Sequence, residues 1–334
     1  MEIGTQKTGR SCITYERLGE RGMRRHWLIA FVGCLLVSMM NTTCLAVGDT
    51  VIYQRNGATT SFSSMVTALA HADVVFVGEI HNNAPGHRFE LSLLRALHAA
   101  GGAKCLSMEM FSRDVQPVVD EYLDGFITHS EFMADARPWS NYTKDYAPMV
   151  EYCRANHIPV IAANAPRRYV HLVSQRGIAA LQQLPEASRQ FLAPLPISLI
   201  IPAGYRDALM GVFGDVHGEQ PSSTGNPAPP ASSTEIERMI EAQMVWDATM
   251  AWSVAQRLSS YPGTKLMQVN GAFHSDNYWG IVARLRELNP HAVTLTITVR
   301  PASSASPTAK MTESELQQAD YTVLTPASPE EGAH

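Results

Sequence analysis

Residues 74–83 read Val74-Val75-Phe76-Val77-Gly78-Glu79-Ile80-His81-Asn82-Asn83, an apolar run closed by a glycine and then by polar side chains. Such a run is typical of a β-strand that is buried on both faces and whose carboxyl end opens into a polar loop. Open parallel sheets bind their ligands at that end of the strands. Glu79 and His81 are two residues apart, so they point to the same side if the extended backbone continues. A helix-capping turn that contains a histidine is the alternative.

A second stretch of the same kind lies far downstream, where Leu266-Met267-Gln268-Val269-Asn270 is followed by Gly271-Ala272-Phe273-His274. The tetrapeptide Gly-x-x-His therefore follows an apolar run twice. We expect each glycine to let the backbone turn sharply off its strand. Because parallel strands all end at one edge of a sheet, the two histidines are expected to face a common crevice.

Strand-like and helix-like segments alternate along the rest of the chain. Strands are expected at 50–53, 74–77, 104–110, 158–164, 265–269, 292–299 and 321–324, and helices at 61–70, 85–99, 115–123, 146–157, 235–258 and 276–288. This alternation predicts an α/β fold with a mostly parallel sheet covered by helices. Residues 177–260 depart from it, with helix-like pieces and a stretch at 218–233 that is rich in glycine, proline, serine and threonine. This composition predicts a mobile surface loop within a helical insertion or a smaller helical subdomain.

The amino-terminal residues 1–46 have the pattern of a secretory signal. Arg24 and Arg25 precede an apolar segment that runs from Trp27 to Met40 and is followed by small and polar residues. Met23 directly precedes the arginine pair, which suggests that translation starts there. An uncleaved membrane anchor is the alternative, and Cys34 or Cys44 is a candidate for lipid attachment.

The exported part is then a domain over residues 47–300, followed by a C-terminal segment and tail over 301–334. Its length and the 45% apolar composition suit one large α/β domain or two small ones, and a net charge of −5 gives no reason to expect nucleic-acid binding. Cys105 and Cys153 lie in apolar segments of this domain and are expected to be buried free thiols, with a disulfide between them as the alternative. The chain has no CxxC metal-binding spacing.

Polar side chains follow the expected strands and define a candidate site. They are Glu79, His81, Glu109, Asn164, Arg167 and His274, with His87 one turn into the next helix. The long helix at 235–258 adds Asp247 on its apolar stripe and Gln243 one turn earlier. A carboxylate on such a stripe must be paired or face a cavity. A salt bridge to a core arginine is the simpler explanation, and lining of the site is the alternative that we favour.

Two chemistries fit these side chains. Two histidines and two carboxylates, with His81 and His274 as metal ligands, could bind a divalent ion such as Zn²⁺ or Mn²⁺. A glutamate and a histidine could instead form a general acid/base pair without a metal. The chain lacks HExxH, GxSxG and a glycine-rich phosphate loop, which disfavours zinc peptidases, serine hydrolases and nucleotide-binding proteins of the familiar kinds.

The ordered set of motifs resembles the ChaN family of haem-binding lipoproteins, which belongs to a superfamily with the erythromycin esterases and the Tiki proteases. The motifs are residues 77–83 with His87, residues 107–111 with Gln116, residues 139–146, residues 163–167, residues 243–251 and residues 270–274. The resemblance covers residues 70–300. It implies a parallel-sheet domain with a smaller helical domain, a place in the bacterial cell envelope as a periplasmic protein or an anchored lipoprotein, and a part in haem or iron uptake. It further implies a homodimer that holds haem, with a tyrosine on the iron.

The residues leave open which tyrosine serves the iron. An exposed tyrosinate, often backed by a histidine, suits ferric haem. Tyr205 with His217 is the preferred pair because both flank the predicted mobile loop, and Tyr142 and Tyr146 form the other candidate pair. A half-buried aromatic ring with its hydroxyl group in water is the plain alternative for each tyrosine.

The wider superfamily implies a second function. In the Tiki relatives the paired Gly-x-x-His motifs support metal-dependent peptide cleavage, and in the erythromycin esterases similarly placed histidine and glutamate are linked to hydrolysis of a lactone. A hydrolase of this kind would use Glu79 or Glu109, aided by His81 or by a metal, to activate water.

Overall fold

The computed structural model describes residues 50–202, 204–218, 232–302 and 311–327, and for residues 212–218 it gives the course of the backbone only. Eight strands are present in this part of the chain: β1 (Val51–Gln54), β2 (Thr59–Thr60), β3 (Val74–Glu79), β4 (Leu106–Ser112), β5 (Val160–Asn164), β6 (Leu266–Gly271), β7 (Thr294–Pro301) and β8 (Tyr321–Thr325). They form one sheet in the order β2-β1-β8-β7-β3-β6-β4-β5. All neighbours from β8 to β5 are parallel, and β1 and β2 are added antiparallel at one edge.

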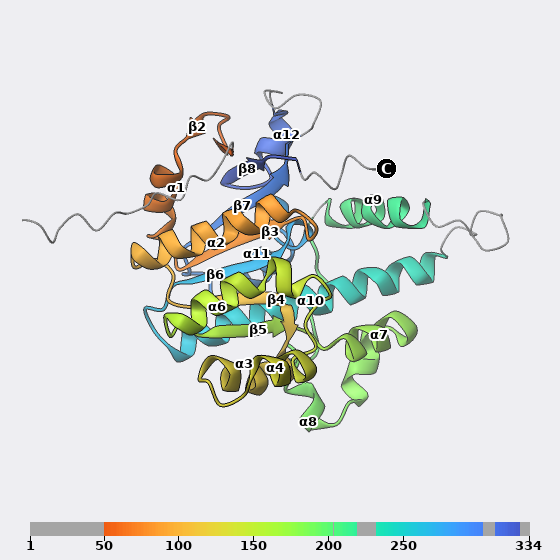
Figure 1. Cartoon of the computed structure of the whole chain (residues 1–334). Coiled ribbons are helices and arrows are strands. Elements are labelled where there is room, and N and C mark those ends of the chain that lie inside the picture. Colours follow the sequence, from red (N-terminus) through yellow and green to blue (C-terminus); the bar gives the residue numbers. More distant parts are fainter. Residues whose placement is uncertain (1–49, 203, 219–231, 303–310, 328–334) are drawn as a thin grey trace, which may run out of the picture. The chain divides into compact units, whose positions relative to one another are not determined.

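Helices connect these strands and cover both faces of the sheet (Figure 1). The α-helices are α1 (Phe62–Leu69), α2 (Ala84–Ala99), α3 (Gln116–Leu123), α4 (His129–Asp135), α5 (Tyr142–Asp145), α6 (Ala147–Ala155), α7 (Arg167–Arg176), α8 (Glu186–Arg189), α9 (Tyr205–Gly218), α10 (Ser233–Ser260), α11 (Gly280–Leu288) and α12 (Glu313–Leu316). Short 3₁₀ helices are η1 (Arg113–Val115), η2 (Ile178–Gln183), η3 (Ala272–His274) and η4 (Asp276–Tyr278). The predicted α/β fold with a mostly parallel, helix-covered sheet is confirmed. In the described ranges, no helix is both long enough and apolar enough to cross a bilayer.

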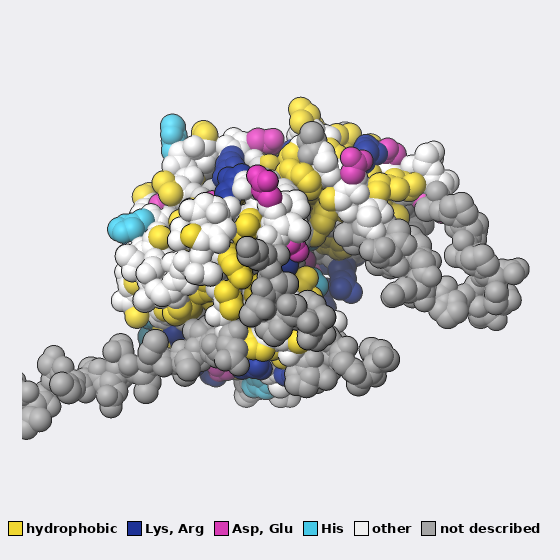
Figure 2. Space-filling model, turned by 90° about the horizontal axis from the view of Figure 1, so that it is seen from above, with side chains coloured by type: hydrophobic (Ala, Val, Ile, Leu, Met, Phe, Trp, Pro, Cys, Tyr) yellow, Lys and Arg dark blue, Asp and Glu magenta, His cyan; other side chains and the backbone are white. Residues whose placement is uncertain are grey.

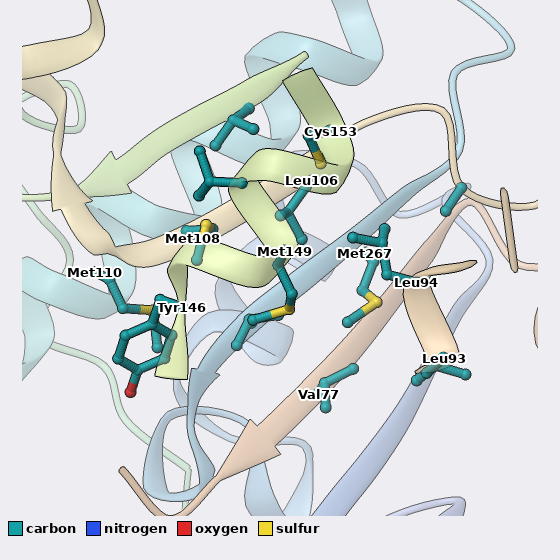
Figure 3. Close-up of a cluster of buried hydrophobic side chains, with 14 of the residues drawn as sticks. Val77, Leu93, Leu94, Leu106, Met108, Met110, Tyr146, Met149, Cys153 and Met267 are labelled. Atoms are coloured by element: carbon teal, nitrogen blue, oxygen red, sulfur yellow. The ribbon is translucent and has the colours of Figure 1, made fainter. Parts of the chain in front are cut away.

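Strand β3 is buried on both faces, as its unbroken apolar run predicts. Val75 and Val77 pack into a core with α1, α2 and α6, whereas Val74 and Phe76 pack on the opposite face against α10 and α11. Figure 3 shows the first of these cores, where Val77 lies close to side chains of α2, α6 and the neighbouring strands. The alternation of side chains along the strand therefore divides an all-apolar sequence between two separate cores.

The strand order reverses at β3, and this reversal determines where a ligand can bind. From β3 the chain passes to β4 and β5 on one side of β6, and from β6 it crosses to β7 and β8 on the other side of β3. Glu79, the last residue of β3, lies in register with Gly271, the last residue of β6. The carboxyl ends of β3, β4, β5 and β6 thus meet at a switch point of a parallel sheet, where α/β proteins open a crevice.

The segment between β5 and β6 contains no strand in its described residues and consists of helices joined by irregular stretches, the longest of them over residues 190–202. Helices α7, η2 and α10 share a small core that includes Val173, Leu181 and Val245. Helix α10 begins with a capping box in which the side chain of Ser232 accepts a hydrogen bond from the amide of Glu235. Because α10 continues from this core onto the face of the sheet that holds α11, it positions its central residues beside the carboxyl ends of the strands.

The expected helix over 276–288 is wrong in its first turn. Asn277 and Tyr278, within η4, have positive φ angles of 59° and 61°, so the regular helix α11 begins only at Gly280. The amide of Asn277 donates a hydrogen bond to the carbonyl oxygen of Gln318, 2.7 Å away. The amide of Asn277 thus bonds to a segment 41 positions away and not to a carbonyl oxygen of its own helix. The local sequence pattern does not indicate this long-range hydrogen bond.

Both cysteines of the described chain are free and buried, as expected. The face of the molecule in Figure 2 carries acidic and basic side chains intermixed, with hydrophobic side chains between them. This mixed surface agrees with the small net charge of −5.

Candidate functional site

A cavity of about 1000 Å³ opens at the carboxyl ends of the strands. Six of the polar residues singled out from the sequence line it: His81, Glu109, Asn164, Arg167, Gln243 and His274. They come from the strand ends, from the first turn of α7 and from α10. The structure thus brings together side chains that are almost 200 positions apart in the sequence, and it places the imidazoles of His81 and His274 in one cavity.

The first imidazole is held by a buried carboxylate. Glu79 is 2% exposed at the end of β3, and its Oε1 lies 2.8 Å from Nδ1 of His81. The hydroxyl group of Tyr146 donates to the same oxygen at 2.6 Å. Burial alone would raise the pKa of Glu79, but the hydrogen bond from His81 and the charge of His87, whose Nδ1 lies 3.2 Å from Oε2, outweigh burial and lower this pKa. Burial likewise opposes protonation of His81, and the hydrogen bond to Glu79 raises the pKa of that imidazole above its ordinary value.

The second imidazole has the same support from a different element. Nδ1 of His274, in η3, lies 2.6 Å from Oδ1 of Asp247 in the middle of α10. Tyr205 donates its hydroxyl group to the other oxygen of Asp247. Burial lowers the pKa of His274, but the charges of Glu109 and Asp247 overcome this effect and raise the pKa to about 9. Asp247, on the apolar stripe of α10, is therefore paired with a histidine and not with a core arginine.

Glu109 lies between the two imidazoles. Its Oε1 is 3.6 Å from Nε2 of His274, and its Oε2 accepts a hydrogen bond from the amide of Gly271 at 2.8 Å. Among the described side chains, none forms a hydrogen bond with Nε2 of His81. The site thus consists of two carboxylate–imidazole pairs that each present Nε2 beside a third carboxylate, an arrangement suited to proton transfer or to binding a Lewis acid.

The glycines of the two Gly-x-x-His motifs do not have the expected role. Neither Gly78 nor Gly271 has a positive φ angle, so the backbone at these positions does not need the conformational freedom of glycine. A Cβ on Gly271 would lie 2.9 Å from Cε1 and 3.0 Å from Nε2 of His81, and a Cβ on Gly78 would lie 2.8 Å from Cα of Ala272. The glycines leave room for the ring of His81 and for the backbone that follows β6.

A third group of polar side chains lies beneath the first pair. Nδ1 of His87 is 3.2 Å from Oε2 of Glu79 and 3.2 Å from Oε2 of Glu90, and all three residues are buried. His87 was expected in the site, but it lies under the cavity and does not line it. Glu90 was not expected. Its signal in the sequence is a carboxylate on the apolar stripe of α2, the same signal that identified Asp247.

The structure does not pair His81 with His274 as metal ligands. In the described part of the chain, the histidine and carboxylate set whose ligand atoms all lie within 4.8 Å of one another is Glu79, His87 and Glu90. His81, His274 and Glu109 do not form such a set. Glu79, His87 and Glu90 therefore form a candidate set of metal ligands that differs from the one expected.

The expectation of an exposed Tyr205 is wrong. Its side chain is 1% exposed and contacts Phe273, Trp279 and Asp247, and burial together with the charge of Asp247 raises its pKa. Tyr142 and Tyr146 are buried as well. The side chain of His217 lies outside the described residues. The structure thus gives no support to the Tyr205 and His217 pair as an exposed haem ligand.

The wall of the cavity that faces the histidines is basic and aromatic. Arg137 and Arg168 both form ion pairs with Asp114, whereas no ion pair to Arg167 is present among the described residues. Trp139 packs edge-on against the ring of His81 at a centroid distance of 4.8 Å. Trp246 contacts His274 in the same manner from α10. Of these side chains, Arg167 was expected in the site, and Trp139 and Trp246 lie in the motif segments 139–146 and 243–251.

Fold and site together define an α/β protein with a ligand cavity at the switch point of a parallel sheet. Residues 65–285 match the family described as "Haem-binding uptake, Tiki superfamily, ChaN". The match covers more than half of the chain, and the protein belongs to this family.

Comparisons with single proteins extend this result. The solved structure titled "Cofacial heme binding to ChaN of Campylobacter jejuni" is similar with a TM-score of 0.60, at 15% sequence identity over 83% of this chain and 97% of that one. An erythromycin esterase variant in its open conformation gives a TM-score of 0.43 at 14% identity, over 83% of each chain. At these identities the likeness concerns the fold.

A curated relative is the chloroplastic protein RETICULATA-RELATED 5 of Arabidopsis thaliana, which is 25% identical over 252 residues. The alignment covers 70% of this chain, and the chain spans about a third of that relative's length.

Proposed function

We propose that this protein binds haem in the cavity at the carboxyl ends of the strands, with Nε2 of His81 as the iron ligand. The observation that carries the proposal is the state of His81. Its side chain is 43% exposed, its Nδ1 is held by the buried Glu79, and its Nε2 has no hydrogen-bond partner in the described chain. A histidine that ligates a metal commonly has its other ring nitrogen fixed by a carboxylate in this way.

The remaining walls suit a haem. The volume of about 1000 Å³ lies at the upper end of the range for ligand pockets, roughly 300 to 1000 Å³. Trp139 and Trp246 offer flat apolar surfaces, and Arg167 offers a guanidinium group for a propionate. Membership of a haem-binding family supports the same ligand.

Titration with hemin, followed by absorption in the Soret region, tests the proposal. Wild-type protein should bind one haem with the spectrum of a histidine ligand, and His81→Ala should weaken binding at least tenfold. His71→Ala is the matched control, because His71 is an exposed histidine outside the cavity. Since the hydrogen bond to Glu79 raises the pKa of His81, and ligation needs the unprotonated ring, binding should tighten as the pH rises.

If His81→Ala and wild type bind haem with equal affinity, His81 is not the iron ligand and another residue binds the iron. Absence of any spectral change on hemin addition to the wild type would overturn haem binding altogether.

We further propose that this haem binding serves haem or iron uptake by a protein exported to the bacterial cell envelope. The amino-terminal sequence of residues 1–46, with Cys34 or Cys44 for a lipid, supports export. The family description includes uptake. Fractionation of cells that express the full chain tests export to the cell envelope. Transcript levels under iron starvation test the role in haem or iron uptake. Light scattering before and after addition of hemin tests a homodimer in the haem-loaded state.

A second candidate function is hydrolysis by general acid/base catalysis. The convergence of the Glu79–His81 and Asp247–His274 pairs on Glu109 favours it, because the geometry allows one imidazole to take a proton from water while the other donates one. An ester or peptide substrate would lie across Glu109. The test is hydrolysis of a panel of esters and peptides by haem-free protein, with activity lost in both His81→Ala and His274→Ala. Activity that survives in both variants would exclude this mechanism.

A further inference from the structure

A buried cluster of Glu79, His87 and Glu90 lies under the cavity floor, between β3 and the first turns of α2. The three residues are 2%, 4% and 0% exposed. One ligand atom from each lies within 4.8 Å of the others. Each comes from a regular element, since Glu79 ends β3 and the other two are three positions apart on α2. The cluster is therefore held by the scaffold and not by a loop.

With both carboxylates ionised the cluster would carry unbalanced negative charge, and burial together with the charge of Glu79 raises the pKa of Glu90 to about 8. The groups that act on the two carboxylates are the imidazoles of His81 and His87, the hydroxyl group of Tyr146 and the carboxylates themselves. His81 already shares its proton with Oε1 of Glu79, which leaves His87 to compensate Glu79 and Glu90 together. Two carboxylates at this depth need a further positive charge or a bound proton.

Two buried oxygen atoms are left without a hydrogen bond. They are Oε2 of Glu79 and Oε1 of Glu90, one on each carboxylate of the cluster. A buried acceptor without a donor costs about 1 to 3 kcal/mol, and more when it is charged. Because Oε2 of Glu79 lies 3.2 Å from Nδ1 of His87, a cation in place of the proton on that nitrogen would give this unpaired oxygen a partner.

The imidazole of His87 is oriented as a metal ligand. Its Nε2 lies 3.0 Å from the carbonyl oxygen of His81, which fixes the proton on that nitrogen when the ring is neutral. Nδ1 is then an acceptor, 3.2 Å from an oxygen of each carboxylate. Ligand atoms bound to one ion at about 2.0 to 2.2 Å lie roughly 3 to 3.5 Å apart, so these separations suit a common ion.

We propose that Glu79, His87 and Glu90 form a binding site for one divalent transition-metal ion, distinct from the ligand cavity above it. One imidazole and two carboxylates suit Zn²⁺ or Mn²⁺. The ion replaces the proton on Nδ1 of His87 and any proton on Glu90, so binding releases protons and tightens as the pH rises. Glu79 links this site to the cavity, because its Oε1 forms the hydrogen bond with Nδ1 of His81, which lines the cavity.

The experiment uses the full chain after treatment with a chelator. Zn²⁺ or Mn²⁺ is added both to the folded protein and during refolding, because the site is buried, and bound metal is measured by mass spectrometry after gel filtration. Wild type should retain one ion per chain. Glu90→Gln should bind at least tenfold more weakly, whereas Glu109→Gln, which alters a carboxylate of the cavity, should bind like wild type.

Thermal unfolding separates loss of the site from loss of the fold. Without metal, Glu90→Gln should be at least as stable as wild type, because it removes one of two facing buried carboxylates. Metal should raise the Tm of wild type and leave that of Glu90→Gln unchanged. Wild type that retains no metal, wild-type metal affinity in Glu90→Gln, or loss of the metal in Glu109→Gln each overturns the proposal. Hemin titration of the same metal-free samples tests haem binding separately.

Discussion

Asp247→Asn should change how the stability of this protein depends on pH. In the wild type the buried His274 has a pKa of about 9, against 6.5 for an ordinary histidine, and Asp247 lies 2.6 Å from its Nδ1. A histidine whose pKa is raised by folding stabilises the native state fully below pH 6.5, and this contribution disappears as the pH rises through 9. The asparagine keeps the size of the side chain but removes one of the two charges that raise the pKa of His274, with Glu109 remaining, so this pKa should fall toward its ordinary value.

The magnitude follows from proton linkage. Between pH 6.5 and about 9 the unfolded wild type has lost the proton that the native state still binds. Its free energy of unfolding therefore falls by about 1.4 kcal/mol for each pH unit, or roughly 3 kcal/mol over the interval. His87, with a pKa raised to about 11 by Glu79 and Glu90 against the opposing effect of burial, contributes the same slope to both proteins. The difference between the two proteins isolates His274.

Urea unfolding at intervals between pH 6.5 and 9 measures this difference. The stability gap between wild type and Asp247→Asn should be widest at pH 6.5 and should narrow by about 2 to 3 kcal/mol by pH 9. Proton NMR of the His274 ring gives the two pKa values directly. Parallel stability curves, or an unchanged titration of His274 in the variant, would refute the assignment of Asp247 as the partner that keeps this imidazole protonated.

Three further outcomes are expected. Gly271→Ala should displace the ring of His81, which lies 2.9 Å from the position of the added Cβ, and should lower the free energy of unfolding in urea by about 1 to 3 kcal/mol while weakening hemin binding. Tyr146→Phe removes a hydrogen bond of 2.6 Å to the buried Glu79 and should cost about 1 to 3 kcal/mol in the same assay, with no change in the far-UV spectrum. Leu93→Ala, in the core between α2 and the sheet, should cost about 2 to 5 kcal/mol, and a loss below 1 kcal/mol would contradict the packing described for α2.

The fold could be predicted from sequence because its signals are local. The apolar run of β3 and the alternation of strands and helices needed only patterns of a few residues. The convergence of His81, Glu109 and His274 followed from one rule, that parallel strands end at the same edge. It was enough to know that each of these residues follows a parallel strand, because the rule holds whatever the order of the strands in the sheet.

The partners of the site residues could not be predicted in the same way. That Tyr205 donates to Asp247, and that Nδ1 of His274 faces the same carboxylate, depends on how α9 and α10 pack against η3. Tyr205 and Asp247 are 42 positions apart in the sequence, and Asp247 and His274 are 27 positions apart. No periodic pattern of the sequence specifies contacts over such separations. Glu90 differs from Asp247 in this respect, because no motif points to it and its role depends on its position beside His87, 3.2 Å from Nδ1.

Glu79 links the two sites proposed for this protein. One oxygen of its carboxylate accepts hydrogen bonds from His81 and Tyr146, and the other lies beside His87. A cation at the second oxygen withdraws negative charge from the first, which weakens the hold of Glu79 on the proton of His81. An occupied lower site should therefore lower the pKa of His81 and make its Nε2 available to iron at lower pH, whereas an empty one favours the protonated imidazole. Because the same carboxylate takes part in both events, the buried cluster can adjust ligand binding in the cavity without any movement of the backbone.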